Sequence, residues 1–162
     1  MTTILPGAEP FRFDGDTASV LVLHGFTGTT QSMRYVGEQL NKLYGFTTAG
    51  PRLAGHGTSV DDMETKGYLD WLNSAEEALK ALAAEGRPVF VIGLSMGGSI
   101  TLNLAARFGD IVKGAISVNA PALFLGSDMA GLLCDPNAPA RIPGIGSDIK
   151  DPGATELAYS EV

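Results

Sequence analysis

Short runs of consecutive apolar residues alternate along the chain with longer stretches in which apolar residues recur every three or four positions. The runs cover residues 19–23, 46–49, 89–92 and 112–118, and turn-forming residues bound each of them. The runs at 19–23 and 89–92 are continuous rather than alternating, which is typical of strands covered on both faces of a parallel sheet. We therefore expect four strands, with a short hairpin around residues 11–13 before them.

The stretches between these runs predict three helices, each with one apolar face. The first helix follows an N-cap at Ser32 and ends at Gly45, while Gly86 closes the second and Gly109 the third. Their recurring apolar residues are Met33, Val36, Leu40 and Leu43, then Leu69, Leu72, Ala75, Leu79 and Leu82, then Met96, Ile100, Leu104 and Phe108. Strands that alternate with helices indicate an α/β domain with a mostly parallel sheet, in which active sites gather at the carboxyl ends of the strands.

Composition narrows the class of protein. The chain has 162 residues, which is enough for one domain at about 150 residues per domain. With 44% hydrophobic and 18% charged residues it can bury a core, and its net charge of −7 opposes non-specific binding to nucleic acid or to an anionic membrane. Cys134 is the only cysteine, which excludes an intramolecular disulfide and fits a reducing compartment.

Two stretches bear on targeting. Residues 1–7 lack the basic and apolar regions of a signal peptide. The uncharged stretch 88–106 has the length of a membrane-spanning helix, but its glycine and polar residues suit a strand followed by a helix better than a helix facing lipid. We expect a cytoplasmic protein without stable insertion into a membrane.

The strongest local signal is Gly93-Leu94-Ser95-Met96-Gly97, which follows a buried strand and opens a helix. A serine on such a strand-to-helix turn can adopt a strained backbone conformation that exposes its hydroxyl above the sheet, and the glycines on either side leave room for the turn. A serine N-cap in a glycine-rich turn would give the same pattern. The preceding strand and the following helix favour Ser95 as a nucleophile, with Gly93 and Gly97 as supporting glycines.

A second motif, His24-Gly25-Phe26-Thr27-Gly28, follows the first buried strand. An acyl-transfer enzyme needs two N–H donors for the oxyanion, one from the residue after the nucleophile and one from a loop after an earlier strand. Met96 and Phe26 are the natural donors, with His24 and Gly25 supporting the loop. The alternative is a glycine-rich loop that merely crosses the edge of the sheet.

Together these motifs resemble the bacterial carboxylesterase and monoacylglycerol lipase group of α/β-hydrolases. The matching motifs, in order, are His24-Gly25-Phe26-Thr27-Gly28, Gly55-His56-Gly57, Asp70-Trp71, Gly93-Leu94-Ser95-Met96-Gly97-Gly98 and Asn119-Ala120-Pro121. The resemblance implies an α/β-hydrolase fold and hydrolysis of carboxylic esters of small to medium acyl chains through an acyl-enzyme on Ser95. It also implies Phe26 and Met96 as the oxyanion hole, a small apolar ester as substrate, and no metal or cofactor.

The chain departs from this family at the catalytic triad, whose members follow the order serine, acid, histidine. Its two histidines, His24 and His56, both precede Ser95. We expect His24 to hold loop geometry and His56 to have a structural or rim role. The acids after Ser95 are Asp110, Asp128, Asp135, Asp148 and Asp151, and none of them follows a recognisable later strand.

The missing triad leaves two hypotheses open. In the first, residues 1–118 are the N-terminal part of the hydrolase core, without the C-terminal strands, and residues 119–162 are the start of an irregular cap of a truncated enzyme. In the second, the chain is a non-catalytic α/β binding module with a vestigial nucleophile turn. A reading frame that continues past Val162 into a strand ending in Asp and a later histidine would favour the enzyme. The oligomeric state is left open.

Other chemistries fit the sequence less well. Gly98 stands where a phosphate-binding loop needs a lysine, and no G-x-G-x-x-G spacing of a dinucleotide site is present. Cys134 follows no predicted strand, so we interpret it as a small hydrophobe. The acidic residues of 61–85 are interpreted as mostly a solvated helix face; they are Asp61, Asp62, Glu64, Asp70, Glu76, Glu77 and Glu85. No cluster has metal-ligand spacing.

Overall fold

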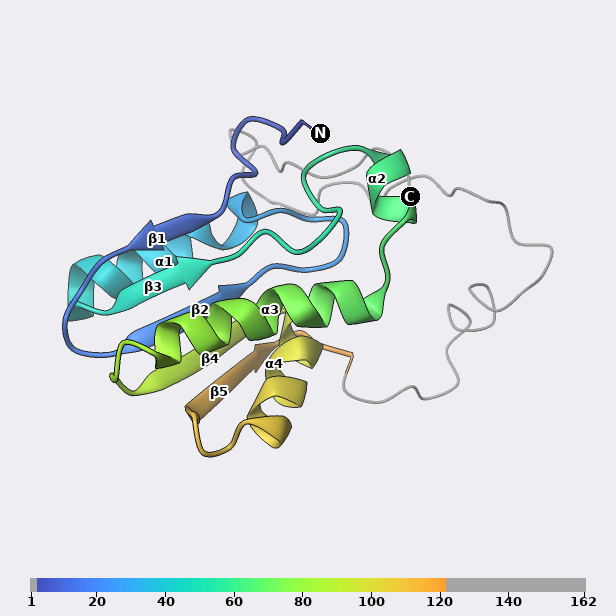
Figure 1. The fold of residues 1–162 in the computed structure, drawn as a ribbon. Helices are drawn as coiled ribbons and strands as arrows, with labels where there is room; N and C mark the ends of the chain where they lie inside the picture. Colours follow the sequence, from blue (N-terminus) through green and yellow to red (C-terminus); the bar gives the residue numbers. More distant parts are fainter. Residues whose placement is uncertain (1–2, 122–162) are drawn as a thin grey trace.

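A computed structural model describes residues 3–121 of the chain. Five strands form one sheet in the order β1-β3-β2-β4-β5, in which β1 runs antiparallel to β3 and the other neighbours are parallel (Figure 1). The strands are β1 Phe11–Phe13, β2 Ser19–Leu23, β3 Thr47–Gly50, β4 Val89–Leu94 and β5 Val112–Val118. The helices are α1 Gln31–Tyr44, α2 Val60–Glu64, α3 Tyr68–Ala83 and α4 Met96–Arg107. The α/β architecture with a mostly parallel sheet is confirmed.

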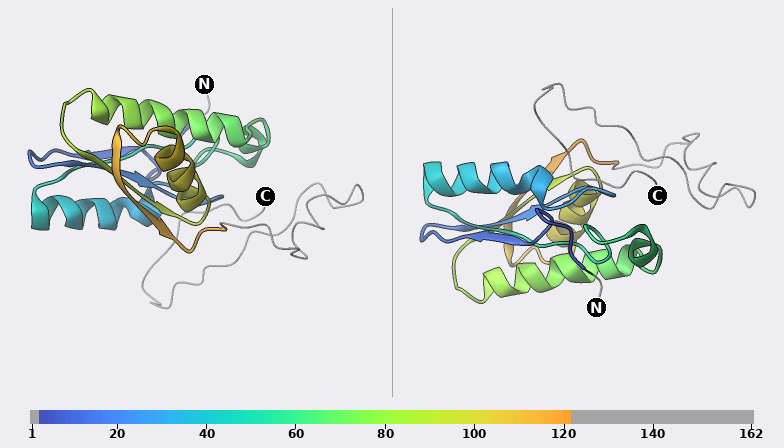
Figure 2. Two further views of the ribbon diagram at one scale, coloured as in Figure 1. Left: turned by 90° about the horizontal axis from the view of Figure 1, so that it is seen from below. Right: turned by 90° about the horizontal axis from the view of Figure 1, so that it is seen from above.

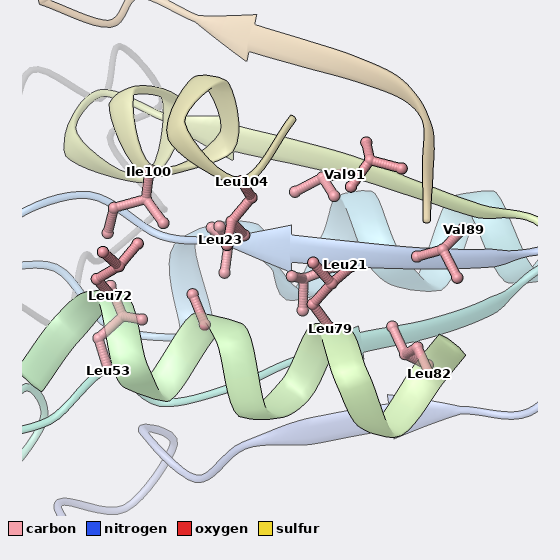
Figure 3. Close-up of a cluster of buried hydrophobic side chains, with 12 residues drawn as sticks. Leu21, Leu23, Leu53, Leu72, Leu79, Leu82, Val89, Val91, Ile100 and Leu104 are labelled. Atoms are coloured by element: carbon pink, nitrogen blue, oxygen red, sulfur yellow. The ribbon is translucent and has the colours of Figure 1, made fainter. Parts of the chain in front are cut away.

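The sheet lies between two helical layers, with α1 on one face and α3 and α4 on the other (Figure 2). The larger core cluster packs α3 and α4 against β2 and β4, and Leu21, Leu79 and Leu104 are among its fully buried members (Figure 3). A smaller cluster under α1 contains Val20, Val22 and Met33. Both faces of β2 are therefore buried, as its continuous apolar run predicts.

Most predicted boundaries are confirmed, two local expectations are wrong, and one short helix is not expected from the sequence. Helix α1 begins at Gln31 rather than after Ser32, whose hydroxyl instead donates to the Thr29 carbonyl at 2.9 Å. The segment around residues 11–13 forms no hairpin with the next strand, because β3 lies between β1 and β2. Helix α2, capped by the Ser59 hydroxyl at 3.2 Å from the Asp62 nitrogen, is not predicted by the apolar pattern.

Two glycines, Gly37 and Gly50, leave the space in which the Phe11 ring of β1 packs. A Cβ built on Gly50 would lie 2.2 Å from the Phe11 ring, and one on Gly37 would lie 2.5 Å from it. The ring therefore occupies space that only glycine leaves open on β3 and α1. This contact joins β1 to two elements that are distant in the sequence.

The uncharged stretch 88–106 forms β4 and α4, joined at Ser95, as expected. None of the helices within residues 3–121 has the length and apolar character that crossing a bilayer requires. The predicted cap lies, from residue 122 onward, outside the described residues. The division into core and cap and the cytoplasmic location therefore stay predictions.

Candidate active site

The parallel register brings the carboxyl ends of three strands to one edge of the sheet. Leu23 of β2 lies opposite Gly93 of β4, and Leu94 of β4 lies opposite Val118 of β5. The loops that begin at His24, Ser95 and Asn119 therefore leave the sheet side by side. This is the edge where sites form in open α/β sheets.

Ser95 occupies the sharp turn between β4 and α4. Its backbone has φ 52° and ψ −119°, and it is one of three non-glycine residues with positive φ among residues 3–121. The turn is fixed on both sides: the Ser95 N–H donates to the Val118 carbonyl at 2.8 Å, and the Ser95 carbonyl accepts from the Gly98 N–H at 2.8 Å. A non-glycine residue in such a conformation persists only where its surroundings hold it.

Gly93 and Gly97 allow this turn to form. A Cβ on Gly93 would lie 2.1 Å from the Gly97 carbonyl oxygen, and a Cβ on Gly97 would lie 2.4 Å from the His24 carbonyl oxygen. Both clashes are with backbone atoms, which cannot rotate away. The glycine spacing that the sequence shows is therefore required where α4 crosses the ends of β2 and β4.

The loop after β2 lies directly against Ser95. A Cβ on Gly25 would be 3.3 Å from the Ser95 Cβ and 3.9 Å from its Oγ. Within residues 3–121, neither the Phe26 N–H nor the Met96 N–H donates a hydrogen bond. The two N–H groups predicted as oxyanion donors, one in the loop after β2 and one at the start of α4, are therefore unpaired within the described residues, and both lie beside the serine. Thr27, next to Phe26, has φ 61°.

His24 ties the loop after β2 to the loop after β3. Its ring is buried, with Nδ1 at 2.9 Å from the Gly25 carbonyl oxygen and Nε2 at 3.2 Å from the Leu53 nitrogen. The Leu53 N–H needs an acceptor, so Nε2 is unprotonated and Nδ1 carries the hydrogen. Burial, aided by the neighbouring His56, lowers the His24 pKa to about 3. Both ring nitrogens are committed to this link, and neither contacts Ser95.

His56 is also buried and neutral, so a place at the rim is excluded. Its Nδ1 lies 3.1 Å from the Ala54 carbonyl oxygen, and Arg52 donates to the His56 carbonyl at 2.8 Å. Burial lowers the His56 pKa to about 4. His56 is therefore part of the loop's interior packing.

The described acidic residues do not approach Ser95 as a triad acid would. Asp110 follows α4 at the opposite edge of the sheet, where β5 begins, and Asp128, Asp135, Asp148 and Asp151 lie outside the described residues. Glu76 corrects the expectation of a solvated acidic face: it is 9% exposed and pairs with Arg107 and Lys80. Within residues 3–121 no group of His, Cys, Asp and Glu side chains could hold a metal ion.

Comparison with known proteins shows the family to which this chain belongs. The profile of the alpha/beta hydrolase fold family matches residues 18–155. The chain belongs to the alpha/beta hydrolase fold family. It is 43% identical over 158 residues to a thermostable monoacylglycerol lipase of Bacillus sp. strain H-257, covering 98% of this chain and 62% of that protein. It is 35% identical over 114 residues to a carboxylesterase of Bacillus subtilis, covering 70% of this chain and 45% of that protein.

A solved hydrolase structure agrees with the sequence comparison. It comes from work on LipS and LipT, two metagenome-derived lipolytic enzymes, and superposes with a TM-score of 0.90 at 43% identity. The match covers 98% of this chain and 64% of that structure. The chain thus spans less than two thirds of the length of these hydrolases.

Three aromatic rings at this edge form a cluster that the sequence patterns do not predict. Phe26 lies 5.4 Å from Trp71 and 6.1 Å from His56 between ring centroids, and His56 lies 5.6 Å from Trp71. The rings come from the loop after β2, the loop after β3 and α3. The Gly55-His56-Gly57 and Asp70-Trp71 motifs contain two of them, but the sequence gives no sign that these rings meet.

Proposed function

We propose that this chain carries the nucleophile and the oxyanion hole of a serine hydrolase acting on carboxylic esters, of the monoacylglycerol lipase and carboxylesterase kind. The observation that carries the proposal is the positive φ of Ser95 at the turn between β4 and α4, with the Gly25 loop packed against it. This conformation is costly, and such strain clusters at active sites. The esterase and lipase names of the relatives at 35% and 43% identity support the reaction class.

In the proposed reaction the Ser95 Oγ attacks the carbonyl carbon of the ester and loses its proton to a general base. The carbonyl π electrons move onto oxygen, and the N–H groups of Phe26 and Met96 stabilise this oxyanion. Met96 is the first residue of α4, so the helix dipole adds positive potential there. As the intermediate collapses, the bond between the carbonyl carbon and the alcohol oxygen breaks, the conjugate acid of the base returns its proton to that oxygen, and the free alcohol leaves an acyl-Ser95, which water then hydrolyses.

The general base of this proposal is neither His24 nor His56. These are the only histidines of the chain, both are buried, and the nitrogen bonds of His24 are fully used within the loops. We assign the base and its acid partner to sequence outside these 162 residues, in keeping with the greater length of the relatives. A small apolar ester is the proposed substrate.

Labelling of the chain with a fluorophosphonate, in the presence of imidazole to replace the absent general base, tests the nucleophile. We expect one covalent adduct, mapped to Ser95 by mass spectrometry, which is lost in Ser95→Ala. Ser99→Ala is the matched control, because it removes a hydroxyl from the next turn of α4 that donates to the Pro121 carbonyl at 3.2 Å. An adduct at another residue, or none at all, would contradict the assignment and favour the non-catalytic binding module.

The assignment of the base has its own test. Without a base the chain should hydrolyse a p-nitrophenyl ester slowly, and added imidazole should raise this rate by about tenfold, a part of the roughly 10²- to 10⁴-fold that a positioned base contributes. Ser95→Ala should abolish the imidazole-dependent rate. A chain that turns over rapidly with no response to imidazole would show that a base is already present.

A further inference from the structure

The loop that holds the proposed oxyanion donor needs an anchor. Phe26 has a side chain that is 47% exposed and has no polar atom, and its neighbour Thr27 has φ 61°. A β-branched residue rarely adopts this conformation, and it keeps it only when the surrounding structure fixes the backbone. The direction of the Phe26 N–H therefore depends on contacts elsewhere in the loop.

The rings of Trp71 and His56 supply such contacts. The Phe26 and Trp71 rings are inclined at 58°, and the Phe26 and His56 rings at 76°. His56 and Trp71 also contact each other, at 74°. Centroid distances of 4.5–7 Å with tilted or edge geometry are those that aromatic pairs prefer, so all three pairs are favourable. Each of these three rings thus contacts the other two, His56 also contacts the His24 ring at 4.9 Å between centroids, and Phe26 is held from two sides.

The polar atoms of these rings do not explain their presence. Within residues 3–121, neither His56 Nε2 nor Trp71 Nε1 has a hydrogen-bond partner, although both atoms are buried. Leaving buried polar atoms unpaired lowers stability, so an aliphatic or phenyl side chain would suit a purely structural core better. His56 is itself fixed by the Ala54 carbonyl, which makes it a rigid support.

We propose that Trp71 and His56 are positioning residues for the oxyanion hole. They hold the ring of Phe26 and thereby aim the Phe26 N–H at the oxygen of the bound ester. Helix α3 begins at the edge where β2 and β4 end, so its first turns can reach the loop directly (Figure 1). The catalytic consequence rests on the proposed function, whereas the ordering of the Phe26 backbone does not.

Two readouts on the full 162-residue chain test the proposal. The first is the second-order rate constant for fluorophosphonate labelling of Ser95, measured at one fixed imidazole concentration that supplies the absent general base. The second is the order parameter of the Phe26 amide, measured by ¹⁵N relaxation on protein labelled with ¹⁵N-phenylalanine. The variants are Trp71→Ala, Trp71→Phe and His56→Phe. The control Tyr68→Ala removes a half-exposed ring from the same helix, whose hydroxyl accepts from Asn103 at 3.1 Å.

We expect Trp71→Ala to lower the labelling rate by about tenfold, less than the loss of a whole oxyanion donor, and to lower the Phe26 order parameter from about 0.85 to below about 0.6. Trp71→Phe and His56→Phe keep a ring in place and should remain within about threefold of the parent rate. Tyr68→Ala should change neither readout. Thermal unfolding of each variant verifies that the fold is kept.

The remaining outcomes separate the two proposals. An unchanged Phe26 order parameter in a folded Trp71→Ala variant would overturn the positioning role, whatever the labelling rate. A tenfold loss in His56→Phe with an ordered Phe26 would also overturn it, because the imidazole would then act chemically. If the parent chain is not labelled but Phe26 loses order in Trp71→Ala, the nucleophile proposal fails while the positioning of the N–H stands.

Discussion

The edge of the sheet where the parallel strands begin, the amino edge, and the edge where they end, the carboxyl edge, differ in backbone strain. Among residues 3–121, the three non-glycine residues with positive φ are Thr27, Ser95 and Asn119, and all follow the carboxyl ends of β2, β4 and β5. At the amino edge the left-handed positions are glycines: Gly45 before β3 has φ 67° and Gly86 before β4 has φ 77°. Strain is thus confined to the carboxyl edge.

The amino edge is instead held by ordinary hydrogen bonds. Arg87 donates to the Gly15 carbonyl at 2.8 Å and to the Thr47 hydroxyl at 3.0 Å, and it pairs with Glu85. Glu85 also pairs with Arg12 at 2.9 Å. This comparison teaches that the fold is secured at one edge and that the strained conformations are kept where the proposed chemistry takes place.

The most disruptive test of this comparison is Gly93→Ala. The new Cβ would lie within 2.1 Å of the Gly97 carbonyl oxygen and 2.5 Å of the Thr101 Oγ1, so the turn after β4 has to open. We expect a loss of about 4 kcal/mol or more in the free energy of unfolding, at the extreme of single substitutions, or no folded protein. Urea unfolding followed by circular dichroism measures this loss.

Gly109→Ala is the matched control for that substitution. Gly109 lies just beyond α4, toward the amino edge, and its Cβ would meet the Ala105 carbonyl oxygen only at 3.5 Å. We expect a change within about 0.5 kcal/mol. Equal losses at Gly93 and Gly109 would mean that the carboxyl edge is no more tightly constrained than the amino edge.

Acid is the second way to break the carboxyl edge. The pKa values of His24 and His56 are lowered to about 3 and about 4 in the folded chain, so the unfolded chain binds more protons below pH 6.5. The contribution of the two neutral histidines to the free energy of unfolding is fully present above this pH. It is lost as the pH falls, by about 2 to 3 kcal/mol for each histidine between pH 7 and 4.5. Urea unfolding at a series of pH values measures the slope.

His56→Phe isolates one of these two contributions. The variant lacks one of the protons taken up on unfolding, so its stability should fall by about 2 kcal/mol less than that of the parent over the same pH range. Parallel pH profiles for variant and parent would exclude a depressed pKa for His56. The ion pairs of the amino edge should contribute little over this range, because the pKa of Glu85 is lowered from 4.5 by its hydrogen bond to Arg12, and a carboxyl of this kind loses its stabilising charge only as the pH falls below about 4.5.

Local sequence predicts the elements of this fold better than their partners. The apolar runs place β2 and β5 at their observed bounds, and Gly45 ends α1 as expected. The predicted start of α1 is wrong: Thr30 rather than Ser32 precedes the helix, and the Thr30 hydroxyl does not cap it but donates to the distant Glu9 carbonyl at 2.7 Å. No periodicity can show which hydroxyl residue finds such a partner.

The same limit applies to the site. The spacing of Gly93, Ser95 and Gly97 is a local requirement of one turn, so the sequence predicts it. The contact of Phe26 with His56 and Trp71 depends on three elements meeting in space, and each residue taken alone is compatible with an ordinary core or surface position. The motifs therefore do not predict this contact, because it is set by the three-dimensional packing of segments that are distant in the sequence.

A smaller effect is expected at the amino edge. Arg87→Ala removes hydrogen bonds to the Gly15 carbonyl and the Thr47 hydroxyl, which should cost about 1 to 2 kcal/mol of unfolding free energy. Arg87→Lys should restore little of it, since an ammonium group cannot reproduce the planar fork of the guanidinium. Both variants should label at Ser95 within about twofold of the parent rate. A tenfold fall in labelling would show that the two edges are coupled.

The smallest effect, and the most direct measure of strain, comes from Ser95 itself. Its φ of 52° and ψ of −119° suit glycine better than any residue with a Cβ. Ser95→Gly should therefore unfold with a free energy about 1 kcal/mol higher than Ser95→Ala, reversing the usual order of these two residues at the start of a helix interior. Both variants lose the fluorophosphonate adduct, so the comparison isolates the backbone. If the alanine variant is the more stable of the two, the turn at Ser95 is relaxed, and its conformation no longer supports a nucleophile held under strain.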